Sequence, residues 1–144
     1  MPNTAMTVNI DIGEARNIHP LNKQDVGKRL ALAARNICYG EKDLEYSGPL
    51  LESIAVSGDK VAVKFSHAKG GLSAKGGGKL KGFAIAGSDG KYFWADAEIK
   101  GDSVSVSSDK VKEPVSVRYA WADDPECNLV NGDGLPASPF QAGK

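Results

Sequence analysis

The sequence predicts a mainly β fold: a small antiparallel β-sandwich preceded by one strand-loop-helix unit. Three observations predict it. Short segments of alternating apolar and polar residues recur from about Leu50, turn-forming residues separate them, and helical spacing of apolar residues occurs only before them. The 17 glycines and 7 prolines supply the turns that such a fold needs. With 41% hydrophobic residues, the 144-residue chain can form a packed core.

The first 40 residues contain the strand-loop-helix unit. Residues 6–12 (Met-Thr-Val-Asn-Ile-Asp-Ile) alternate apolar and polar side chains, which predicts a strand, and residues 14–21 are expected to form a loop. Asn22 is a predicted N-cap with Asp25 three residues further on, and the helix is expected to end at Gly40. The helical spacing is carried by Val26, Leu30, Ala33, Ala34 and Ile37.

Six strands are expected in the remainder. Ser57-Gly58-Asp59 and Ser88-Asp89-Gly90 are turn signals that indicate hairpins. The glycine-rich residues 69–79 are predicted to be a long flexible loop, and the tail after Asp123 is predicted to be irregular. The predicted strands cover residues 51–56, 60–65, 82–86, 92–99, 103–107 and 115–121.

A domain boundary is expected near Ser47-Gly48-Pro49, where the pattern changes from helical to alternating. One strand and one helix cannot bury an α/β core alone. Residues 1–46 are therefore predicted to be the last β-α unit of a larger α/β domain, and residues 47–144 a β-sandwich accessory domain. The alternative, in which the first unit packs directly on the sandwich, stays open.

Composition excludes several classes of function. The 18 basic and 18 acidic residues balance to a net charge of zero, so neither nucleic acid nor an anionic membrane is an expected partner. No apolar run approaches the roughly 20 residues of a membrane span, and no signal-peptide pattern opens the sequence. Cys38 and Cys127 can pair or stay free, and composition favours free thiols. Without a CxxC motif, and with only His19 and His67 as histidines, no zinc site is expected.

His19 is the candidate catalytic residue. It lies in the loop between the predicted strand and the capped helix, and Pro20 restricts the backbone after it. An imidazole titrates near neutral pH, so a histidine held between two rigid elements suits a general base. From these residues alone, an ordinary surface histidine remains the alternative.

The residues around His19 carry a family resemblance. Residues 17–23 read Asn-Ile-His-Pro-Leu-Asn-Lys, and the pattern continues at residues 26–31 (Val-Gly-Lys-Arg-Leu-Ala) and at Tyr39-Gly40. This pattern resembles the sialate O-acetylesterase family of SGNH-type hydrolases, at the C-terminal end of the family's sequence. Further similar motifs are Ser47-Gly48-Pro49, Gly70-Gly71-Leu72, residues 82–87, residues 117–121, Asn128-Leu129 and residues 135–140.

The resemblance implies a reaction and a missing partner. In such enzymes a serine attacks an acetyl ester on a sugar, a histidine takes its proton, and an oxyanion hole stabilises the intermediate, with no metal or cofactor. His19 matches the histidine. No segment here matches the family's N-terminal Gly-Gln-Ser-Asn-like block. The chain is thus expected to be the C-terminal part of an acetylesterase, inactive without an N-terminal hydrolase domain, and the family implies a secreted or periplasmic protein.

The acid that orients the histidine departs from the family pattern. In the family that this pattern resembles, an aspartate typically stands three residues before the histidine, and often one directly before Ile-His-Pro. This chain has Arg16 and Asn17 at those two positions. Neither side chain carries negative charge. Asn17 can still hold the loop by hydrogen bonds, and Glu14 or Asp11 can be imagined beside the ring.

Three other segments suggest chemistry and are set aside. Gly101-Asp102-Ser103 matches the letters of an SGNH nucleophile block, but its position between alternating segments predicts a hairpin turn. The loop at 69–79 lacks phosphate-loop spacing, because Ser73 stands where the first glycine belongs. His67 follows a predicted strand and is expected to be an ordinary polar residue at its end.

The aromatic run Tyr92-Phe93-Trp94 supports a second class of function. Successive strand residues face opposite sides, so one side is expected in the core and the other is a candidate sugar-stacking surface. By the same logic Tyr119 and Trp121 are expected on one face and Arg118 on the other. The alternative to an esterase fragment is therefore a non-catalytic carbohydrate-binding or accessory module, and a truncated, inactive product is a third possibility.

Overall fold

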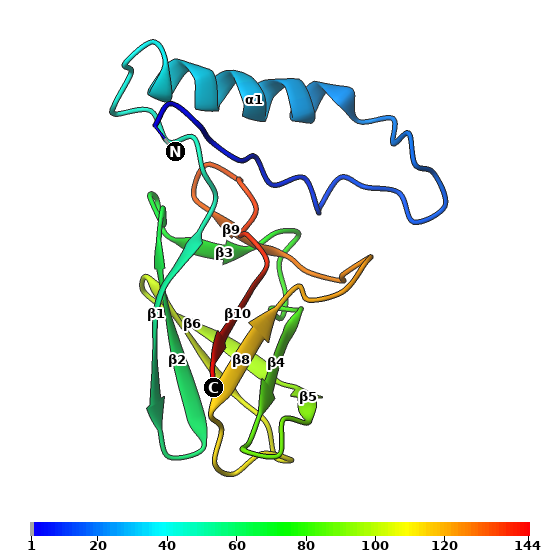
Figure 1. Cartoon of the computed structure of the whole chain (residues 1–144), viewed down its shortest axis with the longest axis vertical. Helices are drawn as coiled ribbons and strands as arrows, with labels where there is room; N and C mark the ends of the chain where they lie inside the picture. Colours follow the sequence, from blue (N-terminus) through cyan, green and yellow to red (C-terminus); the bar gives the residue numbers. More distant parts are fainter. Residues whose placement is uncertain (1) are drawn as a thin grey trace.

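The computed structural model describes residues 2–144, which contain one helix above a body of ten strands (Figure 1). The helix, α1, spans Lys23–Ile37. The strands are β1 (Leu50–Ser57), β2 (Lys60–Ser66), β3 (Leu72–Ala74), β4 (Phe83–Ala86), β5 (Tyr92–Trp94), β6 (Asp96–Lys100), β7 (Ser103–Ser107), β8 (Ser116–Tyr119), β9 (Leu129–Asn131) and β10 (Phe140–Gly143).

The strands of residues 2–144 form two four-stranded sheets, ordered β1-β2-β7-β6 and β10-β8-β4-β5, and a two-stranded sheet, β3-β9. Every pairing is antiparallel. β1 and β2 form the hairpin predicted around residues 57–59, and β4 pairs with β5 across the turn predicted at residues 88–90. The predicted fold class, mainly β with antiparallel sheets after a helix, is confirmed.

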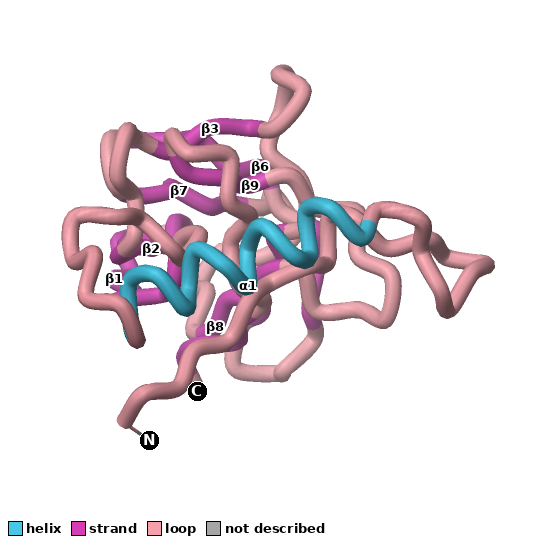
Figure 2. The backbone as a smooth tube through the Cα atoms, turned by 90° about the horizontal axis from the view of Figure 1, so that it is seen from above, coloured by secondary structure: helices cyan, strands magenta, loops and turns pink. Residues whose placement is uncertain are grey.

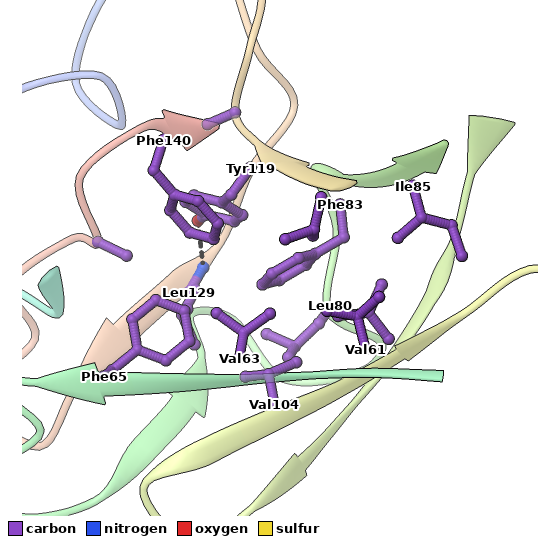
Figure 3. Close-up of a cluster of buried hydrophobic side chains, with 14 of the residues drawn as sticks. Val61, Val63, Phe65, Leu80, Phe83, Ile85, Val104, Tyr119, Leu129 and Phe140 are labelled. Atoms are coloured by element: carbon purple, nitrogen blue, oxygen red, sulfur yellow. Dashed lines mark hydrogen bonds between the residues drawn. The ribbon is translucent and has the colours of Figure 1, made fainter. Parts of the chain in front are cut away.

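One hydrophobic core joins the two four-stranded sheets (Figure 3). In β2, buried and exposed residues alternate strictly, so Val61, Val63 and Phe65 point into the core. From the other sheet, the Phe83 and Tyr119 rings meet at a centroid distance of 4.7 Å. Full burial of such side chains contributes about 1.5–3 kcal/mol each, so this shared core is the main source of stability of what we call the two-sheet domain, β1 to β10.

The helix begins as predicted but is only partly buried. Asn22 caps it: its side-chain oxygen accepts from the Asp25 N–H (3.1 Å), and its amide donates to the Asp25 carboxylate (2.8 Å). The helix ends at Ile37, before the expected Gly40. On the predicted apolar face Ala33 is buried, whereas Leu30 is 55% exposed. The helix therefore keeps an uncovered apolar surface.

The strand predicted at residues 6–12 is wrong. That segment is irregular and runs alongside α1 (Figures 1 and 2). A strand needs a neighbouring strand to satisfy its backbone groups, and within residues 2–144 none pairs with this segment. Side chains bind it instead: Arg29 donates to the Val8 carbonyl (2.7 Å) and forms a two-pronged ion pair with Asp11 (2.6 and 2.9 Å).

Several strand predictions need correction. The segment predicted as one strand at 92–99 is two, because β5 and β6 belong to different sheets and the chain crosses between them at Ala95. The glycine-rich segment 69–79 contains β3, and the tail predicted to be irregular contains β9 and β10. β3 and β9 are three-residue strands that form only against each other, so neither is visible from local pattern.

The faces predicted for residues 92–94 are confirmed, but those predicted around β8 are wrong in part. Phe93 packs against the core while Trp94 is 77% exposed. Tyr119 is buried and faces away from Arg118, as predicted. Trp121 was predicted on the face of Tyr119, but its ring lies 5.6 Å from the Arg118 guanidinium. The cause is Ala120, whose φ of 50° ends the strand and breaks the alternation.

The junction between helix and sheets is buried. Ser47, Gly48 and Pro49 are all largely shielded from solvent. Cys38 is exposed, Cys127 is half-buried, and the two are not paired with each other. The described part of the chain contains no helix that is long and apolar enough to span a bilayer.

Candidate functional site

His19 lies in the loop that precedes α1 and projects beyond the two-sheet domain (Figures 1 and 2). Its side chain is exposed, and its neighbour Ile18 is 90% exposed. Leu21, on the other side of Pro20, is also largely exposed. A histidine flanked by exposed apolar residues is accessible to a substrate or to another protein surface.

Hydrogen bonds within the loop hold its backbone. The Asn17 side-chain oxygen accepts from the His19 N–H (2.9 Å), so Asn17 stabilises the loop as the sequence suggested. Glu14 accepts from the Leu21 N–H (2.7 Å) and from the Asn17 amide (3.2 Å). The Leu21 N–H, and then the Asn17 amide, lower the pKa of Glu14 below its ordinary value. The backbone at His19 is thus fixed from both sides.

Neither acid suggested for His19 reaches its ring. Glu14 is used by the loop backbone, and Asp11 binds Arg29 and Lys75, the latter at 2.8 Å. Burial alone would raise the pKa of Asp11, but the hydrogen bonds and charges of Arg29 and Lys75 lower it. Within residues 2–144 the His19 imidazole has no hydrogen-bond or ion-pair partner. An acid that orients it would have to come from elsewhere.

The Gly101-Asp102-Ser103 motif lies at a hairpin connection, as predicted. Gly101 and Asp102 form the tight connection between β6 and β7, and Ser103 begins β7. Its hydroxyl donates to the neighbouring Asp102 carboxylate (3.1 Å), an interaction that does not activate an oxygen nucleophile as a histidine would. These contacts support the interpretation of Gly101-Asp102-Ser103 as a hairpin connection and not as a nucleophile block.

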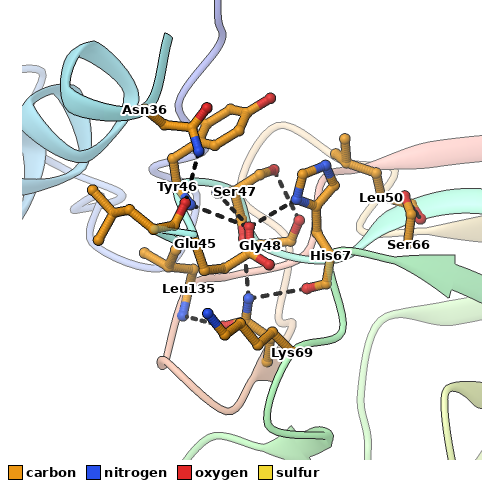
Figure 4. A network of polar contacts seen from close by, with 12 residues as sticks. Asn36, Glu45, Tyr46, Ser47, Gly48, Leu50, Ser66, His67, Lys69 and Leu135 are labelled. Carbon is orange, nitrogen blue, oxygen red and sulfur yellow. Dashed lines mark hydrogen bonds and ion pairs between the residues drawn. The ribbon is translucent and has the colours of Figure 1, made fainter. Parts of the chain in front are cut away.

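His67, the second histidine, belongs to a structural network (Figure 4). Its Nδ1 lies 2.8 Å from a Glu45 carboxylate oxygen, and its ring packs edge-to-face with the Tyr46 ring at a centroid distance of 5.5 Å. The same Glu45 oxygen accepts from the backbone N–H groups of Tyr46 and Ser47. His67 has a φ of 55°, so these contacts hold a backbone conformation that costs free energy.

Asn131 completes this network. Its amide donates to the carbonyls of Ser47 and His67, both at 3.0 Å, and its oxygen accepts from the Leu135 N–H at 3.0 Å. The helix junction, the end of β2 and β9 are thereby joined. The expectation that His67 is an ordinary strand-end residue agrees with this role. Sequence reasoning missed Glu45 and Asn131, because their partners are distant in the chain.

Comparison with known proteins identifies relatives of nearly the whole chain. Sialate O-acetylesterases from Pongo abelii and Homo sapiens are each 33% identical to it over 155 aligned positions, which cover 99% of this chain. The chain is related to the sialate O-acetylesterases. It spans about 29% of the length of these relatives, which fits a C-terminal portion of such a protein.

A solved structure agrees with this acetylesterase relationship. A carbohydrate acetylesterase from Xanthomonas citri is 48% identical and superposes with a TM-score of 0.91, covering 94% of this chain and 32% of that protein. No family model matches the sequence. At this identity the likeness extends beyond the fold, so the resemblance inferred from the residues around His19 is confirmed.

Proposed function

We propose that this chain is the C-terminal part of a carbohydrate O-acetylesterase and that His19 is its general base. Residues 1–46 would be the last unit of the hydrolase domain and residues 47–144 an accessory β domain. The observation that carries the proposal is the setting of His19. Its side chain is exposed, and its backbone is held by a hydrogen bond on a projecting loop. The surrounding segment resembles the one that bears the catalytic histidine of the acetylesterases.

The chemistry divides between this chain and the rest of such an enzyme. A serine oxygen attacks the acetyl carbonyl while His19 takes the serine proton, and the protonated imidazole then gives that proton to the departing sugar oxygen. Water, activated by the same imidazole, releases acetate from the serine. The serine and the oxyanion donors are proposed to lie outside these 144 residues, so the chain alone is proposed to be inactive.

The exposed apolar surface near His19 supports a covering partner. Ile18 and Leu21, in the loop that bears His19, and Leu30, in the middle of α1, are all more than half exposed. Exposed apolar side chains near one another in the chain are consistent with a surface that another domain covers. The missing hydrolase domain is the proposed occupant, and the bound substrate is proposed to be an acetylated carbohydrate.

Acetate release from p-nitrophenyl acetate tests the proposal in two proteins. The 144-residue chain is expected to show no turnover above background. In a longer protein that includes the hydrolase domain, His19→Ala is expected to lower kcat at least about 100-fold, the usual contribution of a general base.

The matched control is His67→Gln, which keeps a hydrogen-bond donor for Glu45 and is expected to leave kcat unchanged. Robust turnover by the 144-residue chain that depends on His19 would refute its proposed incompleteness. Unchanged kcat in His19→Ala of the longer protein would refute the role of His19.

A further inference from the structure

The outer face of the β10-β8-β4-β5 sheet presents an unusual set of side chains. In the strand register, Trp94 stands opposite Ala84, Ala84 opposite Arg118, and Arg118 opposite Gln141. Tyr92 lies two residues before Trp94 in β5 and faces the same side, because alternate residues of a strand share a face. Aromatic and cationic side chains therefore flank a small residue at the centre of the sheet.

Contacts among these side chains fix their positions. The Tyr92 hydroxyl meets the Ser116 hydroxyl at 2.7 Å, which lays the tyrosine ring across the intervening strand β4. The Arg118 guanidinium stacks on that ring, 3.7 Å from its centroid, and its Nε donates to the Gln141 side-chain oxygen at 2.8 Å. Trp121 completes the group at 5.6 Å from the guanidinium. We call Tyr92, Trp94, Arg118 and Trp121 the aromatic platform.

The platform surrounds a hollow. A cavity of about 230 Å³ is lined by the four platform residues together with Gly82, which has no side chain, and Ala84, which has a small one. Trp94 is 77% exposed and Trp121 is 56% exposed, so both indole rings are available at the surface. Large exposed aromatic residues around a hollow are typical of binding sites rather than of an inert surface.

The chemistry of the platform selects a ligand class. Arg118 has no carboxylate partner within residues 2–144 and lines the hollow, and only its Nε is used in a hydrogen bond between side chains. A pyranose ring has an apolar C–H face that stacks on an indole and a rim of oxygens that accept hydrogen bonds from a guanidinium. A nucleic acid strand would also need a basic surface for its phosphates, and the chain's net charge is zero.

We propose that the aromatic platform is a carbohydrate-binding site, distinct from His19, that takes one sugar ring of a glycan. The sugar stacks on Trp94 and Trp121, and Arg118 donates hydrogen bonds to its oxygens. The site uses no residue that the esterase chemistry uses. In the proposed esterase, this site would hold the glycan chain while the acetylated unit is processed at a separate place. Sugar binding by the platform does not itself depend on the proposed catalysis.

The test begins with the 144-residue chain on a glycan array that spans plant, animal and bacterial saccharides. The strongest glycan is then titrated while tryptophan fluorescence is recorded. Trp94 and Trp121 are the two tryptophans of the sequence, so the signal reports on the platform alone. Trp94→Ala is expected to weaken binding at least tenfold, Arg118→Gln is expected to weaken it as well, and Trp94→Phe is expected to retain most of the affinity.

Two control variants show whether binding belongs to the platform. Val56→Ala removes a half-exposed apolar side chain from β1, in the other sheet, and is expected to leave binding unchanged. His19→Ala is also expected to bind normally, which keeps this result independent of the esterase proposal. The proposal is overturned if no glycan on the array shows Trp94-dependent binding, or if light scattering shows that Trp94 instead mediates a dimer.

Discussion

At the scale of single residues, hydrogen bonds to the backbone position His19, whereas catalytic histidines are usually held through the ring. The Asn17 side chain accepts a hydrogen bond from the His19 N–H, and the Glu14 carboxylate accepts one from the Leu21 N–H. The ring itself is unconstrained by residues 2–144, so its orientation depends on what covers it. This arrangement is consistent with the proposal that another part of the enzyme supplies the acid and the nucleophile.

The motif around His19 is local and could be recognised in the sequence, whereas the environment of Trp121 depends on the fold and was predicted wrongly. The alternation rule placed Trp121 with Tyr119, but it assumes that the strand continues. Ala120 adopts a positive φ, which few non-glycine residues do, and no residue-type signal marks it. The place of Trp121 beside Arg118 in the aromatic platform was therefore visible only in the structure.

Asp11 offers a prediction about pH. It is paired with Arg29, and both side chains are 7% exposed, so Asp11→Asn leaves a buried guanidinium without its counter-charge. The loss is expected to be about 3–5 kcal/mol in the free energy of unfolding at pH 7. Urea unfolding followed by circular dichroism of α1 measures it.

The sign of the pH effect follows from the lowered pKa of Asp11. Its stabilisation is complete above the unfolded-state value of about 3.9 and is lost as the pH falls through the lower folded-state value. The difference between the wild type and Asp11→Asn should thus shrink only below about pH 4. Glu41→Gln, which breaks an exposed ion pair with Arg35, is the control and should change little. A difference independent of pH would contradict this account.

At the scale of elements, local pattern located both strands of the β1–β2 hairpin and missed β3, β9 and β10, which pair with distant segments. β7 was predicted with its observed bounds, and β1 with β2 to within a residue. The break between β5 and β6 was missed because both halves alternate without interruption, and only the need to cross from one sheet to the other separates them. The strand predicted at residues 6–12 failed for another reason: its side chains alternate, but no strand within residues 2–144 pairs with it.

The junction of helix and sheets gives a prediction at this scale. A Cβ added at Gly48 would lie 1.9 Å from the Pro136 carbonyl oxygen, which is backbone and cannot swing away. Gly48→Ala is expected to destabilise the chain by about 1–3 kcal/mol, as overpacking usually does. Thermal unfolding measures it. Gly27→Ala, in α1 with nothing within 4 Å, is the control and is expected to stabilise the helix by about 0.5–1 kcal/mol. A neutral Gly48→Ala would mean that the junction is loose.

At the scale of the whole molecule, the core is unevenly distributed along the chain. Apart from Ala33, the buried hydrophobic residues of the described chain all lie between Val61 and Phe140. The N-terminal part is attached mainly by polar contacts, such as Asp11 with Lys75 and Glu45 with His67, and by Ile10 against the edge of the core. The two-sheet domain thus has its own core, whereas the helix lacks one.

This distribution predicts how a fragment of residues 47–144 behaves. It is expected to unfold cooperatively, because the shared core is intact, but at a lower temperature than the whole chain, because the Glu45–His67 contact and the cover of Ile10 are lost. Scanning calorimetry of both proteins compares them. Residues 1–46 alone are expected to be unfolded by circular dichroism, since an isolated helix of 15 residues is marginal in water. If the 47–144 fragment loses its cooperative transition, the helix is an integral part of one domain and the proposed division near Ser47 is wrong.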